Sequence, residues 1–79
     1  MDAGVIHEEI TEQLVCKLEE SRFVHVALMN RIERRIRTRD ELERYATVLI
    51  HKLEDMDYKS ENMIDRVDRV LNMLERSTA

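Results

Sequence analysis

The side chains best suited to hold a ligand are five arginines near the middle of the chain. Arg31, Arg35 and Arg39 are spaced four residues apart, so on a helix they share one face. Arg34 and Arg37 lie beside them. Guanidinium groups gathered in this way could hold the phosphates of nucleic acid or of an anionic membrane, or the carboxylates of a partner protein. The alternative is a solvated face that pairs with nearby acidic residues and stabilises the C-terminal end of a helix.

The charge distribution makes nucleic acid an unfavourable partner for these arginines. Residues 1–30 carry six acidic and two basic side chains, residues 31–39 carry the five arginines and Glu33, and residues 40–79 carry ten acidic and six basic side chains. The chain as a whole has a formal net charge of −4, and no aromatic residue lies between the arginines to stack on bases. We therefore expect the solvated face, with an acidic protein partner as the next alternative and nucleic acid or an anionic membrane as the last.

The residues that most often carry catalysis or bind metals do not form a recognisable site. Cys16 has no histidine placed to activate it. His25 and His51 could approach each other if the chain folds back, but no cysteine accompanies them, and His7 lacks the His-Glu-x-x-His spacing of helical zinc sites. There is no glycine-rich phosphate loop, and carboxylates on a helical rod have no pocket that would raise their pKa values. We expect no enzymatic activity, no catalytic or metal-binding residues and no cofactor.

The elements that would position these side chains are helices. Charged residues make up 38% of the chain, proline is absent, and the one glycine is close to the N-terminus, which is typical of long helices. In the second half of the chain, an apolar seam alternates spacings of four and three residues, as in a helix that is covered by another helix. The seam consists of Leu42, Ala46, Leu49, Leu53, Met56, Ser60, Met63, Val67, Val70 and Leu74. We expect an all-α fold.

A capping signal divides the chain into two predicted helices. Thr38 and Glu41 fit a capping box, which predicts a helix over residues 39–76. A less regular repeat that includes Lys17 and Ser21 predicts a first helix over residues 5–36. A turn at residues 37–39 would join the two in one helical domain that spans residues 1–79.

We expect the chain to fold back at this turn as an antiparallel, coiled-coil-like hairpin. The two repeats then fall in register, with Leu28 opposite Leu49 and Leu14 opposite Met63. Since the connector contains no glycine or proline, one continuous helix in a parallel coiled coil is the alternative. The predicted interaction core consists of Ile10, Leu14, Val24, Leu28, Leu42, Leu49, Leu53, Met56, Met63, Val67, Val70 and Leu74.

Large apolar residues lie outside this seam and would face a partner. They are Phe23, Val26, Met29, Ile50, Ile64, Leu71 and Met73. A two-helix hairpin would leave them in water, whereas each contributes about 1.5–3 kcal/mol when fully buried. A chain of 79 residues usually needs a staple or a partner for stability. We therefore expect a homodimer or a hetero-oligomer, built as a helical bundle of four helices or more.

These patterns favour a small protein–protein interaction module, such as a scaffold or adaptor subunit. One alternative is a small helical chaperone or regulator that masks an amphipathic helix of a client. A further alternative is a nucleic-acid or anionic-membrane binder that acts through Arg31–Arg39. The sequence has neither a membrane span nor a secretory signal, and it has one cysteine, so we expect an intracellular, cytoplasmic location.

Overall fold

The computed structural model describes residues 3–23 and 25–77, and within these residues it is all-α, as predicted. The helices are α1 (Ala3–Glu20), α2 (Val26–Arg35), α3 (Arg39–Asp55) and α4 (Glu61–Ser77). None of the helices in these two stretches has both the length and the apolar character to cross a lipid bilayer.

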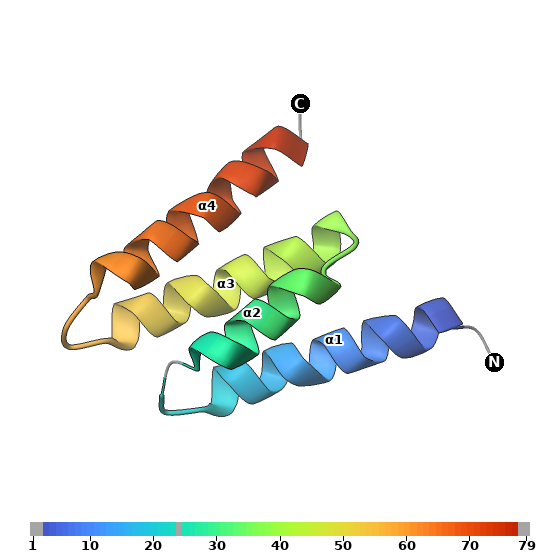
Figure 1. Ribbon diagram of the computed structural model, residues 1–79, viewed down its shortest axis with the longest axis horizontal. Helices are drawn as coiled ribbons and strands as arrows, with labels where there is room; N and C mark the ends of the chain where they lie inside the picture. Colours follow the sequence, from blue (N-terminus) through green and yellow to red (C-terminus); the bar gives the residue numbers. More distant parts are fainter. Residues whose placement is uncertain (1–2, 24, 78–79) are drawn as a thin grey trace.

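The four helices run alternately up and down in a flat array (Figure 1). The array measures 44 × 32 × 16 Å. α1 packs against α2 and α3, and α3 also packs against α4. One end of the molecule therefore carries the α1–α2 and α3–α4 loops. The other end carries the start of α1, the α2–α3 turn and the end of α4 (Figure 1).

The prediction of two long helices is wrong, because each is interrupted by a loop. A small polar residue of the repeat lies at one edge of each loop, Ser21 directly after α1 and Ser60 directly before α4. After α1, the Ser21 hydroxyl accepts a hydrogen bond from the Phe23 N–H at 3.2 Å, a local turn that competes with the helix. After α3, the Ser60 hydroxyl accepts from the Met63 N–H at 3.2 Å and so caps α4. In this chain, a serine of the repeat thus lies next to a helix terminus, Ser21 after the end of α1 and Ser60 before the start of α4.

The predicted turn before residue 39 and its capping box are confirmed. The Thr38 hydroxyl accepts from the Glu41 N–H at 3.1 Å, and the Glu41 carboxylate accepts from the Thr38 N–H at 3.1 Å. The same carboxylate accepts from the Arg37 N–H at 2.9 Å. Backbone donors at the start of α3 are therefore satisfied by side chains from its own first turn.

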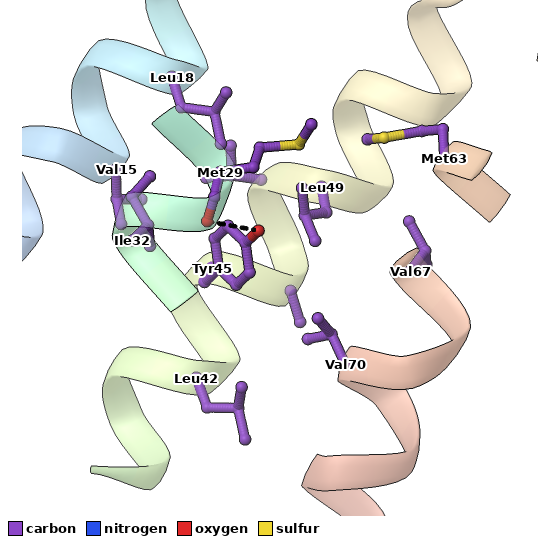
Figure 2. Packing of buried hydrophobic residues seen from close by; sticks show 12 residues of the cluster. Val15, Leu18, Met29, Ile32, Leu42, Tyr45, Leu49, Met63, Val67 and Val70 are labelled. Carbon is purple, nitrogen blue, oxygen red and sulfur yellow. Dashed lines mark hydrogen bonds between the residues drawn. The ribbon is translucent and has the colours of Figure 1, made fainter. Parts of the chain in front are cut away.

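The predicted pairing of the seam is also wrong. Because a loop over residues 56–60 separates α3 from α4, the seam folds back on itself, and its α3 half faces its α4 half (Figure 2). Among the described residues, α4 packs against α3 and not against α1, so Leu14 does not lie opposite Met63. The buried apolar cluster consists of Val15, Leu18, Met29, Ile32, Leu42, Tyr45, Ala46, Val48, Leu49, Met63, Val67 and Val70.

Candidate protein-binding groove

A groove runs between α2 and α4, and we refer to it as the α2/α4 groove. Its wide section, of about 810 Å³, lies toward the loop end, and its lining is part apolar and part polar or charged. The apolar residues are Val26, Met29, Met56 and Met63, and the polar or charged residues are Ser60, Asn62, Asp65, Arg66, Asp68 and Arg69. A middle section of about 250 Å³ follows, with Val70 and Met73 in its lining. An end section of about 460 Å³ lies at the α2–α3 turn and is lined by Ile36, Leu42 and Met73 together with polar residues. The wide and middle sections share Arg69, and the middle and end sections share Met73 and Arg76.

A polar bridge ties the three helices around the groove together. Glu33 of α2 accepts hydrogen bonds at one carboxylate oxygen from the Tyr45 hydroxyl of α3 and from the Arg66 guanidinium of α4. The Tyr45 hydroxyl also lies 3.4 Å from the Met29 carbonyl oxygen (Figure 2). Arg66 lines the wide section and Glu33 the middle one, so the bridge lies where the two sections adjoin.

The bridge is shielded from water, and the pKa values of its members reflect this. Tyr45 is fully buried, and the side chains of Arg66 and Glu33 are 12% and 28% exposed. Burial, followed by the hydrogen bond to Glu33, raises the pKa of Tyr45 well above its ordinary value. Burial alone would lower the pKa of Arg66, but its ion pair with Glu33 outweighs this and the pKa is raised. Tyr45 therefore remains a neutral donor and Arg66 a cation throughout the physiological pH range.

Four arginines surround the middle and end sections, and we call them the arginine collar. They are Arg37, Arg39, Arg69 and Arg76. The acidic residue that lines these two sections is Glu33, so the local charge is positive although the whole chain carries −4. Within the described parts of the chain, the side chains of Arg37, Arg69 and Arg76 form no hydrogen bond or ion pair. The collar is thus a cationic surface with uncommitted donors beside an apolar groove.

Arg39 differs from the other members of the collar, because it is used in the fold. Its guanidinium donates to the Leu74 carbonyl at 3.2 Å and to the Ser77 hydroxyl at 2.9 Å, and it pairs with Glu43 at 3.0 Å. It therefore caps the C-terminal end of α4, and it also lines the end section of the groove.

The predicted basic patch over residues 31–39 does not form one surface. Arg35 lies 3.4 Å from His7 of α1, and its carbonyl accepts from the His7 ring at 2.7 Å. Arg34 donates to the Asn30 carbonyl at 3.4 Å within α2, and Arg31 is exposed. Arg37 and Arg39 are the members that line the groove. The patch disperses because α2 ends at Arg35, so its last members lie on a turn and on the next helix.

The other two members of the collar, Arg69 and Arg76, were not predicted from the sequence. Arg69, Met73 and Arg76 are spaced four and three residues apart, so they share one face of α4. That spacing was a usable signal. In the structure, α4 folds back beside the α2–α3 turn, so Met73 and Arg76 line the same section as Arg37, and Arg69 lines the two other sections.

The predicted core residues lie mainly inside the single chain. Leu42, Leu49, Met63, Val67 and Val70 are buried, and Leu14, Leu28, Leu53, Met56 and Leu74 pack against them partly buried. Ile10 is 37% exposed, and Val24 lies outside the described residues. Half of the predicted seam thus covers the other half, with no second chain present.

Of the residues predicted to face a partner, five are exposed and two are not. The exposed residues are Phe23, Val26, Ile64, Leu71 and Met73. Met29 is buried in the core and Ile50 is partly buried against it. Met29 is covered because α2 packs on α1 and the Tyr45 side chain reaches its carbonyl from α3.

Cys16, which was first considered for catalysis, lies beside ion pairs that join α1 to α3. Arg44 of α3 pairs with Glu12 at 3.1 Å and Glu19 at 2.7 Å, two residues of α1 that flank the half-buried Cys16. The hydrogen bonds to Glu19 and Glu12 raise the pKa of Arg44. In residues 3–23 and 25–77, no group of three or more histidine, cysteine, aspartate or glutamate side chains could hold a metal ion.

Comparison with protein-family models, with curated proteins and with solved structures gives no match to this chain.

Proposed function

We propose that this chain is a protein–protein interaction module, a small scaffold or adaptor subunit that holds an amphipathic helix of a partner protein in the α2/α4 groove. The observation that carries the proposal is a groove, lined in part by exposed apolar side chains, that leads into a collar in which Arg37, Arg69 and Arg76 have uncommitted side chains. Helix-in-groove association is a common way for helical proteins to recognise each other.

The apolar part of the groove can supply affinity. Val26 is 56% exposed and Met73 51% exposed, so both would lose contact with water on binding. Each square ångström of apolar surface that is removed from water contributes about 25 cal/mol. Thioethers such as Met56 and Met73 are flexible and polarizable, which suits them to pack against helices of different shape.

The collar can supply orientation. Carboxylates at one end of the bound helix would meet Arg37, Arg69 and Arg76, and a basic helix would be repelled there. Since these arginines are exposed, their effect on affinity is screened by salt, whereas the apolar contribution is not. The preferred partner is therefore an amphipathic helix with an apolar face and acidic residues at one end.

Two designed helical peptides test this proposal. They share one apolar face and differ in carrying either glutamates or lysines at one end, and binding is measured by fluorescence anisotropy. We expect the acidic peptide to bind and the basic peptide to bind about tenfold more weakly or not at all. Raising the salt concentration should reduce the difference between them.

A matched pair of variants identifies the surface. Met73→Glu places a charge in the groove and should abolish binding of the acidic peptide. Leu71→Glu makes the same kind of change on α4 at a residue that lines no section of the groove, and it should bind like the parent. Failure of both peptides to bind the parent, or equal loss in both variants, would contradict the proposal.

A further inference from the structure

We infer that the helix which occupies the α2/α4 groove is the N-terminal half of α1 from a second copy of this chain. This inference rests on the proposed function and deepens it by naming the partner. It follows from two surfaces of the same molecule that are each incomplete alone and complementary to each other.

The first surface is an uncovered apolar face at the start of α1. Val5 is 49% exposed, and Ile6 and Ile10 are each 37% exposed. Ile6 and Ile10 are four residues apart and therefore lie one above the other on the helix. Within the described residues this face stays exposed, whereas Val15 and Leu18, farther along α1, are buried in the core.

The start of α1 also carries the charge that the collar lacks. Glu8 and Glu9 are exposed, and within the described residues neither forms a hydrogen bond or an ion pair. Glu9 is four residues from Val5, so it borders the apolar face. An apolar stripe beside two free carboxylates is the chemistry that the groove and its arginine collar would select.

The placement of the two surfaces allows reciprocal exchange. The start of α1, the α2–α3 turn and the end of α4 lie at the same end of the molecule (Figure 1). Two copies related by a two-fold axis at this end can each insert α1 into the groove of the other. Such an interface closes on itself and contains two equivalent sites, which is the commonest arrangement of homo-oligomers.

Charge exchange between two variants tests the inference by sedimentation velocity. The collar variant carries Arg37→Glu and Arg76→Glu, and the helix variant carries Glu8→Arg and Glu9→Arg. We expect the parent to sediment as a dimer and each variant alone as a monomer, because like charges then face each other at both sites. An equimolar mixture should sediment as a dimer, since both of its sites pair opposite charges.

Matched substitutions at the opposite end of the molecule serve as controls. Arg22→Glu and Glu20→Arg change exposed residues near the α1–α2 loop and should leave the dimer intact. Circular dichroism verifies that all variants keep the helical content of the parent. A monomeric parent, variants that remain dimeric, or a mixture that stays monomeric would each overturn the inference.

The peptide experiment separates this inference from the proposed function. In a dimer of this kind, the acidic peptide must compete with α1 and should convert the dimer to a peptide-bound monomer. A parent that is monomeric and still binds the peptide refutes the second copy while the groove retains its function. A parent that is monomeric and binds neither peptide refutes both.

Discussion

Glu33 accepts hydrogen bonds from a tyrosine and an arginine that belong to two other helices. Because Tyr45 and Arg66 approach the same carboxylate oxygen, replacing Glu33 would leave Arg66 without its partner and Tyr45 with only the Met29 carbonyl as an acceptor. An ion pair shielded from water is costly to break on one side, whereas replacing both members with apolar residues of similar size is often neutral. The bridge is therefore better understood as a device that sets the distance between α2 and α4 than as a large source of stability.

A double-mutant cycle tests this role of the bridge. We expect Arg66→Leu to lower the free energy of unfolding by about 1–3 kcal/mol, because it leaves the Glu33 carboxylate half-buried without its cation. Glu33→Leu combined with Arg66→Leu should recover most of this loss. Urea denaturation followed by circular dichroism gives the four free energies, and losses that simply add would contradict a coupled pair.

At the scale of the helices, all four C-terminal ends are capped by the same kind of contact. The chain has one glycine, Gly4, so no helix can end with the usual glycine cap. Instead, a cationic or histidine side chain from another segment donates to a terminal backbone carbonyl of each helix. The donors are Lys52 at the end of α1, His7 at the end of α2, Lys59 at the end of α3 and Arg39 at the end of α4. The caps from Lys52, His7 and Arg39 each join two different helices. A side chain that caps one helix therefore also fixes the position of that helix relative to its own.

The start of α3 depends on pH through Glu41. Burial alone would raise the pKa of this carboxyl, but the hydrogen bonds from the Arg37 and Thr38 N–H groups and the nearby His7 outweigh it, and the pKa is lowered below 4.5. A group whose pKa is lowered by folding stabilises the fold above its unfolded value and loses this contribution as the pH falls through the folded value.

Glu41→Gln should therefore destabilise the protein at neutral pH and matter less in acid. We expect a loss of about 0.5–1 kcal/mol in the free energy of unfolding near neutrality, because the amide is a weaker acceptor and does not complement the helix dipole. The denaturation curves of variant and parent should converge as the pH falls below 4.5. A gap that stays constant across the acid range would show that the charge of Glu41 has no part in the cap.

At the scale of the whole molecule, the chain divides its apolar residues between an inner cluster and an outer surface. The inner cluster forms where the two halves of the heptad seam meet, and it includes Leu49, which is fully buried. The outer surface includes Phe23, Val26 and Met73, each more than half exposed. An array only 16 Å thick in its shortest dimension cannot bury more apolar side chains, so the fold retains apolar surface that another helix could cover.

Two leucine substitutions compare the contributions of a buried and an exposed residue to the free energy of unfolding. Leu49→Ala removes a fully buried side chain and should lower the free energy of unfolding by about 2–4 kcal/mol. Leu71→Ala, at a residue that is 36% exposed, should cost less than about 1 kcal/mol. Thermal unfolding at low protein concentration gives both values, and equal losses would mean that the seam is not the core of the single chain.

Much of the local structure follows from short-range patterns in the chain. The heptad spacing predicts that Leu42, Leu49, Val67 and Val70 are buried on helices, and the capping box at Thr38 predicts where α3 begins. Helices close their hydrogen bonds over four residues, and caps act over three, so these features need only local sequence. The serines at the loops were visible as well, but a single polar residue in a heptad seam is compatible with both a continuous helix and a break.

Long-range contacts decide which helices pack against each other. Every heptad seam has the same spacing. The pattern therefore shows that one face of a helix is covered, but it does not identify the helix that covers it. In this chain, the α3 half of the seam is covered by the α4 half. The groove depends on this choice. Arg76 lines the same section as Arg37 because α4 returns beside α3, and the width between α2 and α4 is held by Glu33 and Arg66, which are far apart in the chain. Such contacts form only after the loops have brought distant residues together, which no local periodicity encodes.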